Sequence, residues 1–404
     1  MTFRGINLEN VKNNNRSAIL QLLNNNGAMS RKDIAGRTGL TAASVTLICT
    51  ELLDEGIIVE LGEAVEEKRA GRKKILVDLN PSYKSILCIG IESDETFISV
   101  TDCKGNVLNS EILITDKKAG PEDFLEKIAM ESARLLWDKG ITKNDVLGAA
   151  VSVPGEVDRE HGVSINTFSI WNTPVRIADI LTNKLGIPIV VENNLKTSAE
   201  SEMLFGSGRT EENFVLLKWG PGVGSSIVID RKIYQGAGGL AAEIGHVSTG
   251  KDGKLCNCGR RGCLETEIST HAIIGDIEEE YRKDPESMPV LDSWYRQGNK
   301  MTYKNTGQWA ALRDEKMQKI LTSKIDKLAF GMRNYKSLLD PGKVILMGYM
   351  FDVPGFYERF IGAVKGYDNQ IPDNYFVRSE TFTRIKHIET LATAMNEWFF
   401  EKRV

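Results

Sequence analysis

The sequence predicts an α/β protein with a separate helical head at its amino terminus. Apolar residues recur at helical spacing through the first sixty positions, whereas short apolar runs alternate with helical segments from residue 83 onwards. Alternating strands and helices are typical of layered α/β architectures. Because 404 residues exceed one ordinary domain, we expect a head at 1–82 and a larger α/β part at 83–404.

Three helices are expected in the head. The first has Ala18, Ile19, Leu22 and Leu23 on its apolar face and ends at Gly27. A second helix over 31–38 and a third from residue 41 to about 55 follow, joined by a short glycine-containing turn. Such a pair forms a helix-turn-helix, whose second helix can enter the major groove of DNA.

Capping residues fix where these two helices begin. Ser30 caps the earlier helix, with Asp33 as its capping-box partner, and Thr41 caps the later one. The predicted DNA-contacting residues of this pair are Arg31, Thr41, Ala42, Ala43, Ser44 and Thr46. The outward residues of the later helix are small and include no Arg, Lys, Asn or Gln, so this helix would make few direct hydrogen bonds to bases.

A basic segment joins two short strands expected at 57–62 and 74–78. Five of the seven residues from 68 to 74 are Lys or Arg. Charge runs are often solvated loops, but this one would lie at the tip of a wing, where phosphates and the minor groove are found. The predicted contacts in this tip are Lys68, Arg69, Gly71, Arg72 and Lys73.

The α/β part begins after Pro81. Strands are expected at 86–91, 97–100, 107–114, 146–153 and 187–191, and a helix at 121–139. A further αβ lobe would begin at 214–218, with polar, peripheral helices over 275–330. A closing helix at 385–399 would pack back on the first lobe.

The densest set of potential metal ligands lies between Glu243 and Glu265. Cys256, Cys258 and Cys263 have C-x-C-x4-C spacing, and His246 precedes them by ten residues. Four such ligands can hold zinc in a closed tetrahedron, and glycines within the loop let it turn back tightly. The alternatives are ordinary thiols or a disulfide. Six cysteines in this long chain suit a reducing cytosol better than a disulfide framework.

This run resembles the zinc signature of the ROK family (repressors, open reading frames, sugar kinases). That signature is a Glu-x-Gly-His box followed by Cys-x-Cys-Gly-x-x-Gly-Cys-Leu-Glu. The resemblance covers 83–404 and implies two ribonuclease-H-like lobes of the actin and hexokinase kind. Lobe one would span about 83–194 plus 385–404, and lobe two about 195–384. The head likewise resembles the winged helix-turn-helix of ROK repressors.

The resemblance also implies a site. Structural Zn²⁺ would be held by His246, Cys256, Cys258 and Cys263. A sugar or sugar-phosphate effector would contact Asn166, Asn193, Asn194, Glu243, His246 and Glu265. For Asn166, and for the nearby Trp171, loop packing is an equal alternative. For the two glutamates the alternative is support of the zinc loop.

Three departures from the ROK kinases argue against phosphotransfer. Residues 92–96 lack the glycines of a first phosphate loop, and residues 219–226 carry an intruding Trp and Pro in the second. The catalytic aspartate of the family is replaced by Asn194, and an amide cannot act as a general base. We therefore expect no enzymatic activity.

We expect a DNA-binding transcriptional regulator, a repressor of carbohydrate-metabolism genes that binds operator DNA as a homodimer or homotetramer. One alternative is an active sugar kinase with a DNA-binding head, and another is a regulator that answers to a protein partner. The net charge of −4 gives no global nucleic-acid signal, so attraction to DNA must be local. Without an apolar amino-terminal segment or a run of ~20 apolar residues, we expect a cytoplasmic protein with no membrane segment.

Overall fold

The computed structural model describes residues 8–63, 74–167, 170–382 and 387–400. The chain forms two compact units, Met1–Phe205 with Ile385–Val404, and Gly206–Arg384. The predicted wing-tip residues Lys68, Arg69, Gly71, Arg72 and Lys73 lie outside the described residues. In the described ranges, no helix is sufficiently long and apolar to span a bilayer.

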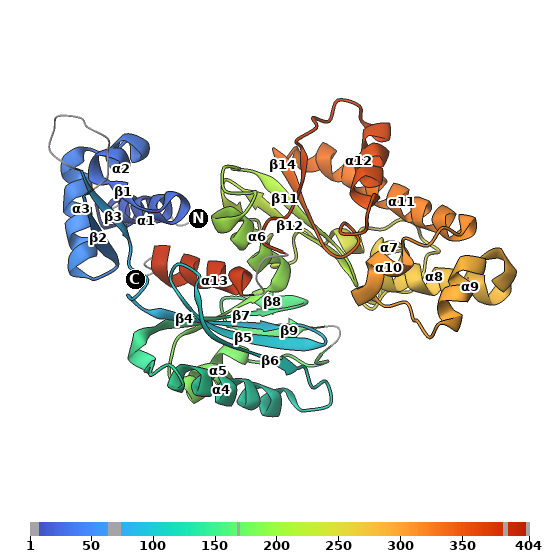
Figure 1. Ribbon diagram of the computed structural model, residues 1–404, viewed down its shortest axis with the longest axis horizontal. Helices are drawn as coiled ribbons and strands as arrows, with labels where there is room; N and C mark the ends of the chain where they lie inside the picture. The colour runs from blue at the N-terminus through green and yellow to red at the C-terminus, as the bar shows by residue number, and fades with distance from the viewer. Residues whose placement is uncertain (1–7, 64–73, 168–169, 383–386, 401–404) are drawn as a thin grey trace. The chain divides into compact units, whose positions relative to one another are not determined.

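The head has the order of elements that a winged helix-turn-helix requires. Its helices are α1 (Leu8–Asn26), α2 (Arg31–Thr38) and α3 (Ala42–Asp54), and its strands are β1 (Met29–Ser30), β2 (Ile58–Glu63) and β3 (Ile75–Leu79). The strands form an antiparallel sheet in the order β1-β3-β2 (Figure 1). Strand β1 was not predicted, because two residues are too few to show the alternation of apolar and polar side chains that marks a strand.

The buried face of α1 differs from the prediction. Ile19, Leu20 and Leu23 are fully buried, whereas Ala18 is exposed and Leu22 is only half-buried. The helix also begins ten residues before the first apolar residue we assigned to it. Adjacent positions 19 and 20 can both be buried because α1 packs on two surfaces, the rest of the head and the carboxyl-terminal helical segment.

The first lobe is built on a five-stranded sheet in the order β10-β7-β4-β5-β6. Its strands are β4 (Ser85–Ile91), β5 (Glu95–Asp102), β6 (Val107–Ile114), β7 (Val146–Val153) and β10 (Ile189–Asn193). Strands β4, β5 and β6 form an antiparallel meander, and β7 and β10 add in parallel. A small hairpin of β8 (Glu156–Asp158) and β9 (Val163–Asn166) follows β7.

Helices cover both faces of this sheet. One face packs against α4 (Pro121–Trp137) and α5 (Ile177–Leu185), and α13 (Ile388–Ala394) lies on the other (Figure 1). The expected closing helix therefore does return to the first lobe. It ends in a π-helical turn, η5 (Met395–Phe400), which contacts α1 of the head.

The second unit repeats the strand topology of the first. Its sheet has the order β13-β12-β11-β14-β15, in which β11 to β13 are antiparallel and β14 and β15 are added in parallel. These strands are β11 (Phe214–Trp219), β12 (Val223–Ile229), β13 (Lys232–Ile233), β14 (Lys343–Met347) and β15 (Phe376–Arg378). Two sheets with one shared topology confirm the predicted pair of ribonuclease-H-like lobes.

The helices of the second unit are α7 (Glu265–Ile268), α8 (Thr270–Lys283), α9 (Pro289–Arg296), α10 (Thr306–Trp309), α11 (Glu315–Leu339) and α12 (Phe356–Tyr367). Residues 275–330 are largely helical, as predicted. Ile277, Leu291, Trp309 and Leu321 are fully buried in the core of this unit, because each of these polar helices keeps one apolar face.

Helix α6 (Asn194–Phe205) belongs to the first unit, although we placed the start of the second lobe at residue 195. The helix packs along α13, and most of its side chains, including charged ones, are buried. Its amino terminus follows directly from β10, so Asn193 and Asn194 lie at the carboxyl end of a parallel strand, where α/β sheets usually bind ligands.

Candidate nucleic-acid interface, metal centre and effector residues

The helix-turn-helix begins with the predicted caps. The Asp33 amide donates to Ser30 Oγ over 3.2 Å, and Ser30 Oγ donates to an Asp33 carboxylate oxygen over 2.7 Å. The Ser44 amide donates to Thr41 Oγ1 over 3.1 Å at the start of α3. Gly39, with φ of 72°, ends α2 in the left-handed conformation that the turn requires. The two helices are therefore set by local sequence signals.

The structure leaves the outward side of α3 open. Thr41, Ala42, Ala43 and Thr46 are exposed, and Ser44 is half-buried. Arg31, the other predicted contact, donates instead to Glu60 of the wing strand β2 over 2.8 Å. This ion pair engages one nitrogen of the guanidinium.

The four predicted metal ligands converge in the second unit. The ligand atoms of His246, Cys256, Cys258 and Cys263 all lie within 4.8 Å of one another. His246 Nδ1 is 3.6 Å from Cys256 Sγ, and Cys258 Sγ is 3.6 Å from Cys263 Sγ. Around a tetrahedral zinc ion with 2.3 Å bonds, sulfur atoms are separated by about 3.8 Å. The donor set and its spacing therefore fit this ion.

Glycine makes the tight loop possible. Gly262 has a φ of 70°, and a Cβ atom there would lie 2.0 Å from the carbonyl oxygen of Gly250. The backbone folds back through a hydrogen bond from the Cys256 amide to the Arg260 carbonyl over 2.8 Å. No other residue type would fit at position 262 without moving the loop.

The electrostatics of the loop favour a thiolate at Cys258. Burial acts to raise its pKa, but hydrogen bonds from the side chain and backbone of Arg260 outweigh burial and lower the pKa to about 6. Burial, together with the neighbouring Cys258, raises the pKa of Cys263 to about 12. A bound cation would favour the deprotonated form of every thiol.

Two glutamates, Glu243 and Glu265, lie beside this loop. Glu265 accepts a hydrogen bond from the Val223 amide over 3.0 Å. Nε2 of His246, the ring nitrogen directed away from the cysteines, lies 3.9 Å from Oε2 of Glu243. The imidazole therefore links the cysteine cluster to a carboxylate with half of its side chain exposed.

The other three predicted effector residues lie in the first unit. Asn193 donates to the Gly155 carbonyl over 2.6 Å, and its Oδ1 accepts from the Leu195 amide at the start of α6. A Cβ atom on Gly155 would lie 2.0 Å from the Asn166 carbonyl oxygen, so Asn193 and Asn166 meet at this glycine. Trp171 is buried against Phe124, with ring centroids 6.4 Å apart, which supports the packing interpretation for the tryptophan.

Asn194 faces a carboxylate. Its Nδ2 donates to Oε1 of Glu92 over 3.1 Å, and Asn194 is 8% exposed. Glu92 is the first residue of the segment that replaces the expected phosphate loop. The hydrogen bond joins this segment to the amino terminus of α6.

Sequence reasoning missed a buried ion cluster next to these residues. Arg159 donates to Glu192 over 2.9 Å, to Glu200 over 3.0 Å and to Glu397 over 3.1 Å. Burial acts to lower the pKa of Arg159, but the surrounding glutamates outweigh burial and raise that pKa above its ordinary value. The cluster ties the β8–β9 hairpin to β10, α6 and the π-helical turn. The one sequence signal was Glu192, which directly precedes Asn193.

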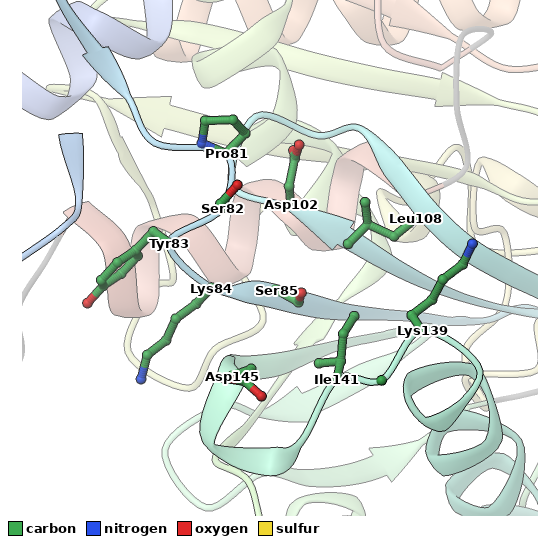
Figure 2. Close-up of a pocket in the computed structure, with 11 residues that line it drawn as sticks. Pro81, Ser82, Tyr83, Lys84, Ser85, Asp102, Leu108, Lys139, Ile141 and Asp145 are labelled. Atoms are coloured by element: carbon green, nitrogen blue, oxygen red, sulfur yellow. The ribbon is translucent and has the colours of Figure 1, made fainter. Parts of the chain in front are cut away.

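A cavity of about 500 Å³ lies at the junction between the head and the first lobe (Figure 2). Residues 81–85, Asp102, Lys139 and Asp145 are among those that line it. Ser85 begins β4, so the cavity is at the amino end of the parallel strands, opposite to Asn193. It contains none of the predicted effector residues, and its charged groups are of both signs.

Known proteins share both parts of this architecture. The ROK family model matches residues 86–387, and a winged helix-turn-helix DNA-binding model matches residues 12–59. The xylose repressor of Caldicellulosiruptor bescii is 28% identical over 346 residues, which cover 83% of each chain. The xylose repressor of Bacillus subtilis is 23% identical over 275 residues, 68% of this chain and 70% of the repressor. A glucokinase of Streptomyces coelicolor is 30% identical over 209 residues, 51% of this chain and 63% of the kinase.

Solved structures show the same fold. The crystal structure of a ROK family transcriptional regulator, a homologue of the E. coli MLC protein, superposes with a TM-score of 0.80, 22% identity and 97% coverage of both chains. A ROK glucokinase of Streptomyces griseus, in complex with glucose and AMPPNP, has a TM-score of 0.65 and 22% identity, and covers 77% of this chain and 98% of its own. The family match spans well over half of the sequence, and the chain therefore belongs to the ROK family, with a winged helix-turn-helix ahead of its ROK domain.

Proposed function

We propose that the protein is a DNA-binding repressor of carbohydrate-metabolism genes whose ROK domain senses a sugar or sugar phosphate without phosphorylating it. Support comes from the joining of a winged helix-turn-helix to a ROK domain and from relatives named xylose repressors. The glucokinase relatives match the ROK domain and make an active kinase the competing function.

The hydrogen bond between Asn194 and Glu92 is the observation that carries the non-enzymatic part of this proposal. A catalytic base at position 194 would have to accept a proton from a sugar hydroxyl, and an amide has no basic site at neutral pH. The present amide instead donates to the Glu92 carboxylate. An aspartate in its place would bring two carboxylates together, and two carboxylates at this distance cannot both ionise freely. The amide at position 194 leaves the site without a general base, and residues 92–96 lack the glycines that would let backbone N–H groups approach phosphate.

The protein would recognise the effector through the hydroxyl groups of the sugar. Asn166, Asn193 and Asn194 offer amide donors and acceptors, and Glu243, His246 and Glu265 offer acceptors and one imidazole. A polyol needs such a mixture, because each hydroxyl both donates and accepts. The hydrogen bonds around Asn193 and Glu265 show side chains held in place by the backbone, which is how a rigid polar site is prepared.

Zinc is the metal we assign to His246, Cys256, Cys258 and Cys263. It would supply a closed structural centre that fixes the loop and takes no part in a reaction. With Nδ1 directed into the cluster, the imidazole of His246 keeps Nε2 directed toward Glu243. Glu265 anchors the following turn to Val223. The chain's own residues thus orient a hydrogen-bonding surface that the metal would only make rigid.

The operator would be a palindrome read by a homodimer or homotetramer, one head for each half-site. Selection of bound duplexes from a random DNA pool, with and without each of a panel of pentoses and hexoses, tests this function. We expect one palindromic sequence to be enriched, and one class of sugar to change its recovery. Enrichment that no sugar alters would favour a regulator controlled by a protein partner. ATP-dependent phosphorylation of a sugar at ordinary kinase rates would overturn the non-enzymatic assignment.

A further inference from the structure

The outward face of α3 carries no charged side chain over its first nine positions. Ala42, Ala43, Thr46, Leu47 and Thr50 are its exposed residues over the first nine positions. Leu47 is 61% exposed, although the opposite side of the helix, with Val45, Ile48 and Cys49, is buried. A single exposed leucine needs no explanation on most surfaces, but this one lies in the middle of the helix that the fold presents to DNA.

The hydroxyl groups on this helix are already engaged. Thr46 Oγ1 donates to the Ala42 carbonyl over 2.8 Å, and Thr50 Oγ1 donates to the Thr46 carbonyl over 2.9 Å. The Thr41 and Ser44 hydroxyls lie 2.8 Å apart and bond to each other. Each threonine on the open face therefore commits its proton to the helix backbone and offers its methyl group and the acceptor lone pairs of its hydroxyl oxygen as the remaining contacts.

No side chain of α3 can make the usual polar base contacts. The sequence of Ala42–Asp54 contains no Arg, Lys, Asn, Gln or His, which are the residues that donate to guanine or pair with adenine. Glu51, which could accept from cytosine, is instead paired with Lys12 of α1 at 2.8 Å. Any sequence preference of α3 must then come from shape, from apolar contact or from its hydroxyl oxygens acting as acceptors.

We propose that α3 reads its half-site through the 5-methyl groups of thymine, with Leu47 and the Thr46 methyl group as the reading elements. This inference rests on the proposed function, in which α3 enters the major groove. The thymine methyl is the apolar group that a base pair presents in that groove. Ala42 and Ala43 are small enough to let the helix approach the base edges, so that Leu47 can reach a methyl group.

Replacement of thymine by deoxyuridine tests the proposal. The change removes one methyl group and keeps the pairing and the O4 acceptor. Each thymine of the selected half-site is replaced in turn, and the affinity of the full-length protein is measured by fluorescence anisotropy. Burial of one methyl group predicts a loss of about fourfold at each contacted position. Leu47→Ala should remove this loss at the position that Leu47 contacts, with an unchanged salt dependence, because no phosphate contact is lost.

Leu338→Ala is the matched control, since Leu338 is 81% exposed on α11 of the second unit. It should leave both affinity and the thymine preference unchanged. Both substitutions are on exposed positions, so thermal unfolding should be unaltered. Equal binding of every deoxyuridine duplex by the wild-type protein would overturn thymine reading while leaving the repressor assignment intact. Failure to enrich any duplex from the random pool would overturn the DNA-binding function itself.

Discussion

Replacing Arg159 with alanine should destabilise the first lobe by about 3–5 kcal/mol, the usual cost of breaking a buried ion pair from one side. The guanidinium lies within 3.1 Å of oxygens from Glu192, Glu200 and Glu397, whose side chains are 0%, 6% and 15% exposed. Without it, three carboxylates share one buried region. A second cation, Lys196, is 4.0 Å from Glu192, a distance too long for the hydrogen bonds that Arg159 makes.

The loss of stability caused by Arg159→Ala should depend on pH in a defined direction. Burial raises the pKa of Glu200 in the folded protein, and Arg159 opposes that increase. Removal of Arg159 therefore raises the folded pKa of Glu200 further above its unfolded value. For such a group, the stabilisation is present below the unfolded pKa and is lost as pH rises through the folded pKa. The difference between variant and wild type should thus shrink as the solution is acidified.

Urea unfolding followed by circular dichroism, together with hydrogen exchange of peptides from α6 and residues 395–400, measures the effect locally. Arg176→Ala is the control, because its single ion pair with Asp179 is largely exposed and should contribute about 0–1 kcal/mol. Adding Glu200→Gln to Arg159→Ala should recover part of the stability by removing one buried charge. A loss no larger than that of the control would refute the reasoning.

Three further predictions concern the sites. Cys258→Ser should lower the zinc content, measured by atomic emission, below one equivalent per chain and should abolish the sugar response. A full sugar response in metal-free protein would contradict the role we give the loop. Asn194→Asp should not create a kinase, because residues 92–96 would still lack the glycines that let backbone N–H groups approach phosphate. A coupled ADP assay checks this, and ADP release at ordinary kinase rates would contradict it. Arg72→Ala with Lys73→Ala should lower the log–log salt slope of operator binding by ~0.9 for each lost phosphate contact, and an unchanged slope would exclude those contacts.

Local signals in the sequence were sufficient for the helix-turn-helix of the head. Ser30 and Thr41 cap α2 and α3 as expected, because a capping side chain bonds to backbone only two or three residues away. The cysteine loop was predictable for the same reason, since three of its four ligands lie within eight residues. Structural features whose interacting residues are close in sequence can be predicted from the local sequence.

The Arg159 cluster could not be found in this way. Its three partners are 33, 41 and 238 positions distant in the sequence, and neither spacing nor period connects them. The Asn194–Glu92 bond likewise joins positions 102 residues apart. Tertiary folding brings these groups together, so the sequence shows the individual residues but not the contacts between them.

The most direct test of the central claim follows operator binding and ADP release together while a sugar is titrated into the full-length protein with Mg–ATP. The sugar is the one that alters DNA recovery in the selection experiment. We predict that operator affinity changes with sugar concentration while ADP release stays at the background rate. Sugar-dependent ADP release, or an operator affinity that remains constant at saturating sugar, would contradict the account.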